Sequence, residues 1–407
     1  MTAPMDPTNM FTPTRAAALA RVAAVQPAAY ARTRNALDGA VTGLSPYITH
    51  GLVSLPEVLA GVAGRHRLDV QHKFVYELGW REFFRHVWQQ RGQGILQSLH
   101  EGPLPEHCYA NALPADIRSA QTGVPVIDQA VRTLYDTGML HNHARMWLAS
   151  YVVHVRKVHW RAGADWLYAH LLDGDLASNH LSWQWVAGTG SSKPYLFNAE
   201  NVARYAPEAW HSPGSVIDTS YEALDRLARD AAKTAGAERK TPVAATTEPE
   251  VHPSPPAALG WSAPDPQTVA GRDVWLVHPW NLGDLPTDLP ADGLVLGLAV
   301  ADFHRAWPWN EARWRFVSER MQALAPVCWS GDAAAIGDAL KAARSVRAVD
   351  ELHLQPWLRQ WADCSAAPAL FPAVERRCDS FSNWWKRAMR DVDSVEALLA
   401  GHPGTEG

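Results

Sequence analysis

The chain has 407 residues, 47% of them hydrophobic, and carries 37 Lys and Arg against 42 Asp and Glu, for a formal charge of −5. This length allows two or three domains with large cores, and the four scattered cysteines, which form no CxxC pair, argue against a disulfide framework and against a zinc or iron–sulfur site. The N-terminus lacks the basic and apolar start of a signal peptide and no apolar run approaches ~18 residues, so the sequence predicts a soluble, cytoplasmic protein that does not span a membrane.

Charge is unevenly spread along the chain. Residues 1–215 hold 18 Lys and Arg, 16 Asp and Glu and 13 of the 18 His, whereas the remaining residues hold 19 Lys and Arg and 26 Asp and Glu. The first half can therefore offer a local positive surface to phosphates, which permits nucleic-acid binding without requiring it. The 19 Trp exceed ordinary usage and favour stacking or electron transfer in addition to core packing.

Apolar residues recur at helical spacing through the first half, for example at Phe74, Leu78, Phe83 and Val87. Gly and Pro interrupt the pattern at intervals, as they do in the turns between helices. We therefore expect a mainly helical domain over residues 14–215.

The first polar motif of this domain, residues 30–51, reads YARTRNALDGAVTGLSPYITHG. Thr42, Ser45 and the backbone N–H groups around Leu44 stand at a predicted Ser-Pro helix start. Hydroxyls, free N–H groups and the helix dipole all favour an anion such as a pyrophosphate there. The alternative is an ordinary helix start without a ligand.

Glu77, Trp80, Arg81 and Phe84 follow on a predicted helix. Their spacing of i, i+3, i+4 and i+7 places a carboxylate, a flat ring and a guanidinium on one face. This combination favours the wall of a pocket, and the alternative is a surface Glu-Arg pair beside a buried Trp.

Residues 122–146 read TGVPVIDQAVRTLYDTGMLHNHARM, in which Asn142, Arg145 and Met146 again share a helix face. The two His of residues 141–143 suggest a metal site, but no Cys or acidic ligand stands at a suitable spacing. We therefore expect no metal.

Residues 173–190 read DGDLASNHLSWQWVAGTG and combine two carboxylates, an Asn, two Trp and a Gly-rich turn. An apolar run is explained by burial, whereas a polar segment interrupted by large rings suits a planar molecule that forms hydrogen bonds. We expect a cofactor to bind here.

Composition changes after residue 215. Residues 216–270 include the Pro-rich stretch 240–256, which cannot bury enough apolar surface to offset its ordering entropy and is expected to be a linker. The remainder alternates between strand and helix patterns, which predicts a smaller parallel α/β, Rossmann-like domain over residues 271–400. Its expected strands are residues 274–278, 293–300, 326–330 and 350–354, and its expected helices are residues 310–324 and 332–343.

These motifs resemble those of the photolyase/cryptochrome family. Residues 173–190 are similar to its pattern DGDLAxNxxxWQWxxGTG, residues 122–146 to TGxPxVDAAMRxLxxTGxMHNRxRM, residues 77–83 to ExxWREF, and residues 30–51 to YxxxRNxxxxxxTSxLSPxLxxG. The resemblance covers roughly residues 14–209. It implies a mainly α, FAD-binding domain of photolyase type, followed by a smaller parallel α/β domain similar to the photolyase antenna domain. Because the antenna domain comes first in the family, the domain order here is reversed.

The resemblance implies FAD as the cofactor. The residues that it places against the flavin nucleotide are Tyr30, Thr42, Gly43, Leu44, Ser45, Arg81, Asn142, Arg145, Asp173, Asp175 and Asn179. Asn179 would lie at the reactive ring nitrogen N5, and Arg145 would pair with Asp173. Val41 and Gly43 stand where the family often carries Thr and Arg, so one hydroxyl and one cation are missing. A second, antenna chromophore is left open, since no motif supports one.

Electron transfer is implied by Trp183, which would lie next to the flavin ring, and by Trp160, which matches the family's middle electron-transfer Trp. The outermost family Trp falls on His107, and Tyr109 or Trp88 would be substitutes unless other donors reduce the flavin. The alternative is that Trp160 only packs in the core.

The lesion-facing residues of the family correspond to Glu77, Trp80, Asn142, Met146 and Trp185. The resemblance implies that Glu77 hydrogen-bonds the pyrimidine carbonyls. Trp80 and Trp185 would form a cleft for a flipped-out pyrimidine dimer, because stacking between rings offsets much of the cost of unstacking the bases.

We therefore expect a deoxyribodipyrimidine photolyase, a lyase that uses blue light and FAD to split cyclobutane pyrimidine dimers in UV-damaged DNA by electron transfer. Its catalytic residues would be Glu77, Trp160, Asn179 and Trp183. The (6-4) lesion stays open as a substrate, although Met146 favours the dimer. The alternative is a cryptochrome-like photoreceptor with a protein partner, favoured by the reversed domain order, by His143 in place of a family Arg and by the acidic second half. A flavoprotein that binds FAD without repair is a third candidate.

Overall fold

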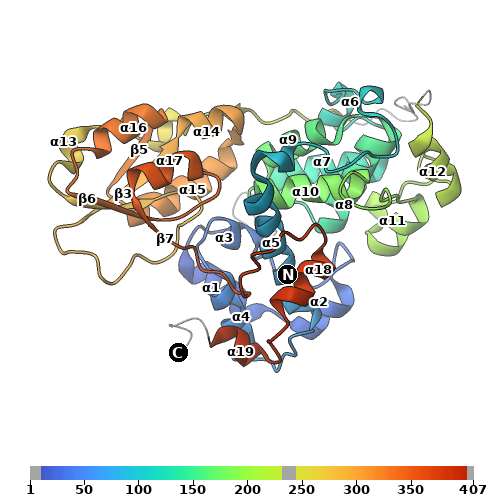
Figure 1. Ribbon diagram of the computed structural model, residues 1–407. Coiled ribbons are helices and arrows are strands. Elements are labelled where there is room, and N and C mark those ends of the chain that lie inside the picture. The colour runs from blue at the N-terminus through green and yellow to red at the C-terminus, as the bar shows by residue number, and fades with distance from the viewer. Residues whose placement is uncertain (1–10, 232–243, 401–407) are drawn as a thin grey trace, which may run out of the picture.

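The computed structural model describes residues 11–231 and 244–400, which form a helical part and an α/β part (Figure 1). The helical part confirms the mainly α domain expected from the apolar spacing. Its elements are α1 (Arg15–Ala24), α2 (Pro27–Thr33), α3 (Ser45–Thr49), α4 (Leu55–Ala63), α5 (Lys73–Arg91), η2 (Gly92–Leu96), η3 (Glu106–Cys108), α6 (Ala115–Arg118), α7 (Pro125–Thr137), α8 (Asn142–Ser150), η4 (Tyr151–Val155), α9 (Trp160–His170), α10 (Leu176–Ala187), α11 (Ala199–Tyr205), η5 (Glu208–Trp210) and α12 (Tyr221–Arg229).

Polar caps and glycines set the ends of these helices. Asp175 caps α10, where its side chain accepts a hydrogen bond from the Ser178 N–H at 2.8 Å. Gly138 follows α7 and Gly188 follows α10, both at positive φ, which glycine adopts without a Cβ penalty. The polar turn at residues 173–175 is thereby held directly before α10.

The α/β part is built on a five-stranded parallel sheet in the order β5-β3-β2-β6-β7. From β2 the chain adds β3 and β5 on one side and then β6 and β7 on the other, as in doubly wound folds. This order confirms the expected parallel α/β class. The elements of this part are β1 (Val251–His252), η6 (Ala257–Leu259), α13 (Pro266–Val269), β2 (Asp273–Val277), β3 (Leu294–Val300), α14 (Ala301–Ala306), β4 (Trp309–Asn310), α15 (Glu311–Leu324), β5 (Val327–Gly331), α16 (Ala333–Leu340), β6 (Ser345–Val349), α17 (Gln355–Trp361) and β7 (Asp363–Ser365). The short strands β1 and β4 form a separate antiparallel pair.

The strand expected at residues 350–354 is wrong. The strand of this region is β6, whose Val346 and Ala348 lie opposite Val274 and Leu276 of β2, and residues 350–354 form the turn before α17. Within β6 only Ala348 is buried, so the strand lacks the apolar alternation that identifies a strand in a sequence. The position of β6 in the sheet follows instead from its pairing with β2.

The carboxyl edge of the sheet packs against α5 of the helical part. Glu351, directly after β6, accepts hydrogen bonds from Arg85 of α5 at 3.2 and 3.3 Å and contacts His353 at 2.6 Å. His353 in turn lies 3.8 Å from the carboxylate of Asp175. Burial raises the pKa of Glu351, but Arg85 and His353 outweigh burial and hold that pKa well below its usual value. The edge at which doubly wound folds bind ligands is occupied here by the helical part.

The chain returns to the helical part after the sheet. α18 (Phe381–Ala388) packs on α5, and α19 (Val395–Leu399) packs on α4, so both lie beside the first helices of the chain (Figure 1). Glu82 of α5 accepts the Phe371 N–H at 3.1 Å, and the Phe381 ring stacks on Trp80 with centroids 4.1 Å apart. The expected division of the chain at residues 215 and 270 stays a prediction.

Part of the expected linker also packs on the helical part. Glu248 accepts a hydrogen bond from Trp166 of α9 at 2.9 Å and contacts His170 at 3.2 Å. The segment 232–243 lies outside the described residues. Within the described ranges, no helix has the length and apolar character needed to cross a membrane, and no three His, Cys, Asp or Glu side chains are grouped to hold a metal ion.

Candidate functional site

Four motifs that are far apart in the sequence meet at one cluster of polar side chains. Arg145 of α8 donates to both carboxylate oxygens of Asp173 at 2.9 Å, and the Asp173 carbonyl accepts the Thr49 hydroxyl at 3.2 Å. Arg81 of α5 donates to Thr49 Oγ1 at 3.3 Å and to Ser45 of α3. The structure therefore brings together Ser45, Arg81, Arg145 and Asp173, four of the residues expected to contact a cofactor.

Arg145 and Asp173 form an ion pair in this cluster, and the Asp173 end of the pair is shielded from water. The Asp173 side chain is only 2% exposed. Burial raises the pKa of this carboxyl, but Arg145, Ser45 and Arg81 together lower it by more than burial raises it. The net pKa therefore lies below its usual value, and the carboxylate stays ionised. Burial lowers the pKa of Arg81, whereas the carboxylates of Asp173 and Asp175 raise it. The cluster thus presents fixed donors and acceptors at a site with little solvent.

The motif at residues 42–45 forms a tight turn before α3. Thr42 Oγ1 accepts the Leu44 N–H at 3.3 Å, and Gly43 has a φ of 62°. A Cβ on Gly43 would lie 2.5 Å from Nη1 of Arg21, whose guanidinium carbon is 4.5 Å from the Phe11 ring centroid. Arg21 from α1 therefore places a cation where the motif lacks one. Sequence reasoning missed Arg21, because only the fold brings it to residue 43.

Tyr30, Asp175 and Asn179 lie around the same cluster. Burial raises the pKa of Tyr30, and the nearby charge of Arg81 opposes that rise. Asn179 donates from its amide to the Ala164 carbonyl at 2.8 Å, which fixes the side chain between α10 and α9. The roles of these three residues toward a cofactor stay predictions.

The expected lesion-facing residues come from α5, α8 and α10. Glu77 forms an ion pair with Arg34 at 3.2 Å. One face of the Trp80 indole is covered by Phe381 at an interplanar angle of 12°, so a further ring can stack only on the other face. Trp185 is 41% exposed and is available to a partner from outside.

Asn142, His143 and Met146 lie at the start of α8. Asn142 is exposed, and its Nδ2 lies 3.5 Å from the Met146 sulfur. His143 Nδ1 lies 2.5 Å from the Asn35 carbonyl, and the ring stacks on Tyr205 with centroids 5.1 Å apart. Burial lowers the pKa of His143, so this side chain does not replace the positive charge of the family's Arg.

Trp183 and Trp160 belong to two closely packed helices, α10 and α9. Gly163 of α9 permits the close approach, since a Cβ there would lie 2.3 Å from the Trp183 ring. Both indoles are 2% exposed, and Trp160 Nε1 donates to Ser98 Oγ at 3.0 Å. His107, which takes the place of the outermost Trp, is exposed on η3. Sequence reasoning missed Gly163, because the residue that packs against a helical glycine is known only from the fold.

Comparison with known proteins gives a match over α5 to α12. Residues 74–243 match the family described as the FAD binding domain of DNA photolyase. The deoxyribodipyrimidine photo-lyase of Salmonella typhimurium is 35% identical over 213 residues, which are 47% of this chain and 43% of that protein. The photo-lyase of Escherichia coli is 33% identical over 210 residues, with 47% and 43% of the two chains covered.

Other relatives match a similar share. The deoxyribodipyrimidine photo-lyase of Thermus thermophilus is 32% identical over 229 residues, 50% of this chain and 53% of that protein. The chain thus spans about half the length of the curated relatives that it matches. Among solved structures, the cryptochrome of Synechocystis sp. PCC6803 is similar over 50% of this chain and 46% of that chain, with 28% identity and a TM-score of 0.44.

Proposed function

The chain belongs to the photolyase/cryptochrome family and carries its FAD-binding domain, and on this premise we propose that it is a light-driven enzyme that splits cyclobutane pyrimidine dimers in DNA. The observation that carries the proposal is the meeting of Ser45, Arg81, Arg145 and Asp173 at one partly buried cluster. The presence of a full set of lesion-facing side chains supports repair over a purely sensory role.

The donors and acceptors of the cluster fit FAD. The turn at Gly43 with the cation of Arg21 and the hydroxyl of Ser45 suits a pyrophosphate, because an anion needs positive charge and short polar donors. The carboxylate of Asp173, held by Arg145, suits the N–H edge of a flavin ring or a ribityl hydroxyl. We assign the other expected cofactor contacts to the same group.

The chemistry is divided between the cofactor and the protein. Reduced FAD, when bound and excited by light, supplies the electron that opens the cyclobutane ring. Glu77 accepts a hydrogen bond from a ring N–H next to the pyrimidine carbonyls, Met146 covers the dimer, and Trp80 and Trp185 hold its rings by stacking. Asn179 contacts N5 of the flavin and helps to set which reduced state persists.

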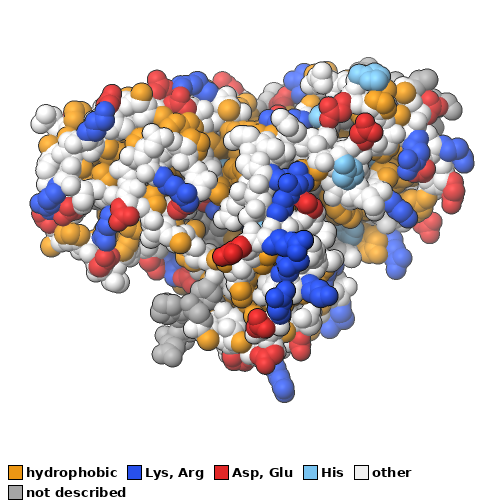
Figure 2. Space-filling model, viewed as in Figure 1, with side chains coloured by type: hydrophobic (Ala, Val, Ile, Leu, Met, Phe, Trp, Pro, Cys, Tyr) orange, Lys and Arg blue, Asp and Glu red, His pale blue; other side chains and the backbone are white. Residues whose placement is uncertain are grey.

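A positive surface supports DNA as the substrate. Figure 2 shows Lys and Arg side chains gathered in a column over α5 and α18. The last turn of α18 contains Lys386 and Arg387, of which Lys386 is exposed. Phosphates bind such surfaces without base specificity, and lesion recognition is then left to the pocket.

The second candidate function is that of a blue-light photoreceptor. It is favoured by two contacts: Phe381 covers one face of Trp80, and His353 with Glu351 connects the sheet to Asp175 beside the cluster. Through these contacts, a change at the flavin reaches the C-terminal residues and the surface that they form.

Photorepair distinguishes the two functions. The protein with reduced FAD is mixed with UV-irradiated oligothymidylate, and illumination with blue light is expected to restore the thymine absorbance. Glu77→Ala is expected to lose at least about tenfold in repair rate, because it removes a hydrogen bond of about 1.5 kcal/mol or more to a charged group, while FAD stays bound. The matched control is Glu319→Ala, an exposed Glu of α15. Absence of recovery by the FAD-loaded wild-type protein would reject repair and leave the photoreceptor.

A further inference from the structure

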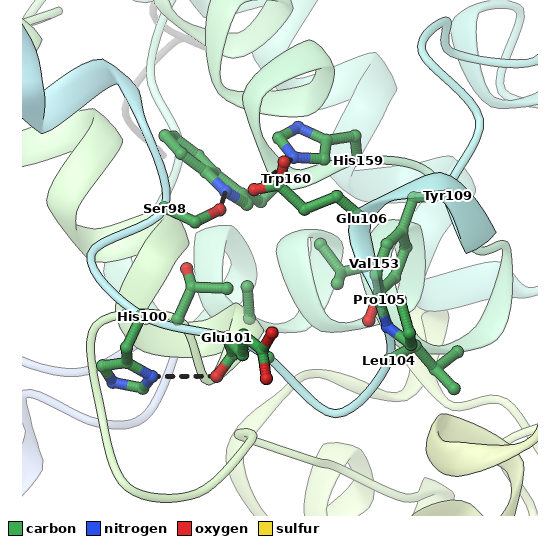
Figure 3. A pocket seen from close by; sticks show the side chains of 13 residues that line it. Ser98, His100, Glu101, Leu104, Pro105, Glu106, Tyr109, Val153, His159 and Trp160 are labelled. Carbon is green, nitrogen blue, oxygen red and sulfur yellow. Dashed lines mark hydrogen bonds and ion pairs between the residues drawn. The ribbon is translucent and has the colours of Figure 1, made fainter.

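A pocket of 430 Å³ lies at the outer side of Trp160 (Figure 3). Its wall combines rings from Trp160, Tyr109 and His159 with the carboxylates of Glu101 and Glu106. A volume of this size is typical of a site for a small molecule, and rings with a few polar groups are the usual lining of such sites. The cofactor cluster around Asp173 shares no residue with this wall.

The pocket lies beside the place where the electron-transfer chain of the family is interrupted. His107 takes the position of the outermost Trp and is exposed, whereas Glu106 and Tyr109 on either side of it line the pocket. On the expectation that Trp160 is the last indole of the electron-transfer chain, the cavity borders the end of that chain. A molecule in the cavity contacts the residues next to Trp160 directly.

We propose that this pocket binds a small, planar, cationic aromatic molecule that donates an electron to Trp160. This inference rests on the proposed function, in which Trp160 and Trp183 deliver electrons to the flavin. The ring of the donor would stack on Tyr109 or His159, which are partly exposed, next to the buried Trp160, and stacking is worth about 0.5–1.5 kcal/mol per ring pair.

The negative charge of the pocket wall favours a donor with a positive charge. Glu101 and Glu106 are both exposed at the pocket rim, and Glu106 lies 3.7 Å from Nε2 of His159. Two carboxylates attract a cation and repel an anion, at low ionic strength above all. Arylalkylamines, whose ammonium group is charged at neutral pH, therefore fit the pocket better than aromatic acids.

The electrons balance as follows. Trp183 gives one electron to the light-excited cofactor and takes one from Trp160. The oxidised Trp160 takes one electron from the indole ring of the donor, which releases its ring N–H proton to solvent and remains as a radical. Both indoles of the protein end in their initial state, and one donor molecule is oxidised for each electron that the flavin gains.

Binding is tested first in the dark, with tryptamine as the probe and the FAD-loaded protein in a calorimeter. We expect saturable binding of one tryptamine per chain, with a Kd below about 1 mM. The double variant with Glu101→Gln and Glu106→Gln is expected to bind about fivefold more weakly at low ionic strength, and Glu319→Gln is expected to bind as the wild type does. Indole-3-propionate, an anion with the same ring, is expected to bind more weakly than tryptamine. Absence of saturable binding overturns the inference without touching the proposed function.

Photoreduction of the flavin tests the electron transfer. Tryptamine is expected to accelerate it with the same midpoint as dark binding, whereas phenethylamine, which lacks the readily oxidised indole, is expected to compete for the pocket without donating. Tyr109→Phe is expected to keep the acceleration, and Trp160→Phe is expected to lose it while dark binding persists. Acceleration that rises linearly with tryptamine, or that disappears in Tyr109→Phe, overturns direct donation from the pocket to Trp160. Failure of the proposed function has another signature, namely a protein with reduced FAD that does not repair dimers.

Discussion

At the scale of single residues, the site depends on a cation that comes from α1 instead of from position 43. A side chain at Gly43 would collide with the guanidinium of Arg21, since a Cβ there lies 2.5 Å from its Nη1. The cation therefore comes from a different segment of the chain and reaches the same turn. A substitution in a binding motif is compensated here by a neighbour in space.

Arg21→Ala is expected to weaken FAD binding by about tenfold to a hundredfold, because hydrogen bonds to charged groups contribute about 1.5–3 kcal/mol. Fluorescence titration with FAD measures the effect. Arg21→Lys should keep part of the affinity, and Arg32→Ala, at an exposed arginine of α2, is the control. Wild-type affinity in Arg21→Ala would remove this residue from the site.

Several site residues were predictable from the sequence because their motifs are contiguous. Arg145 and Asp173 lie in two such motifs, and the structure pairs them at 2.9 Å. Arg21 was not predictable, since no local pattern distinguishes it from another basic residue at the end of a helix. The pocket beside Trp160 was not predictable either, because a cavity is defined by loops that only the fold brings together.

At the scale of elements, the periodicity of apolar residues predicted the helices and the buried strands. It failed for elements whose position is set by pairing with a distant segment. Strand β6 has a single buried residue, Ala348, and its place follows from its neighbour β2. The packing of α18 on α5 was equally hidden, because it joins segments about 300 residues apart. Long-range contacts of this kind leave no local pattern.

The packing of α9 against α10 depends on Gly163. Gly163→Ala would place a Cβ 2.3 Å from the Trp183 ring, and we expect the overpacking to lower the free energy of unfolding by about 1–3 kcal/mol and to slow photoreduction. Urea unfolding and flavin photoreduction measure the two effects. Gly94→Ala is the control, since its Cβ would meet Arg91 at an ordinary 3.7 Å. Unchanged stability and photoreduction would show that α9 and α10 separate freely.

At the scale of the whole molecule, the α/β part is joined to the helical part by buried polar groups. Arg85 and Glu351 form one ion pair of this interface, and Arg15 and Asp284 form another. His353, which contacts Glu351, lies 3.8 Å from Asp175. Removal of one member of a buried pair leaves the other without a partner, which is costly. The two parts are therefore expected to behave as one unit.

Buried histidines make the stability of the whole molecule dependent on pH. Burial lowers the pKa of His154 to about 4, and its Nδ1 has no hydrogen-bond partner among residues 11–231 and 244–400. Between about pH 6.5 and about pH 4 the unfolded state binds more protons than the folded state, so the free energy of unfolding falls as the pH falls. Urea unfolding on both sides of that window is expected to show the loss, and His154→Gln is expected to reduce the slope. Equal slopes in the two proteins would mean that folding does not change the pKa of His154.

The central claim is that the polar cluster around Asp173 holds one FAD per chain. Titration of the protein with FAD, followed by gel filtration and an absorption spectrum of the protein peak, tests this claim most directly. We predict a yellow protein with one FAD per chain and a much weaker retention of FAD in Asp173→Asn. A protein peak that stays colourless after incubation with FAD would contradict the account.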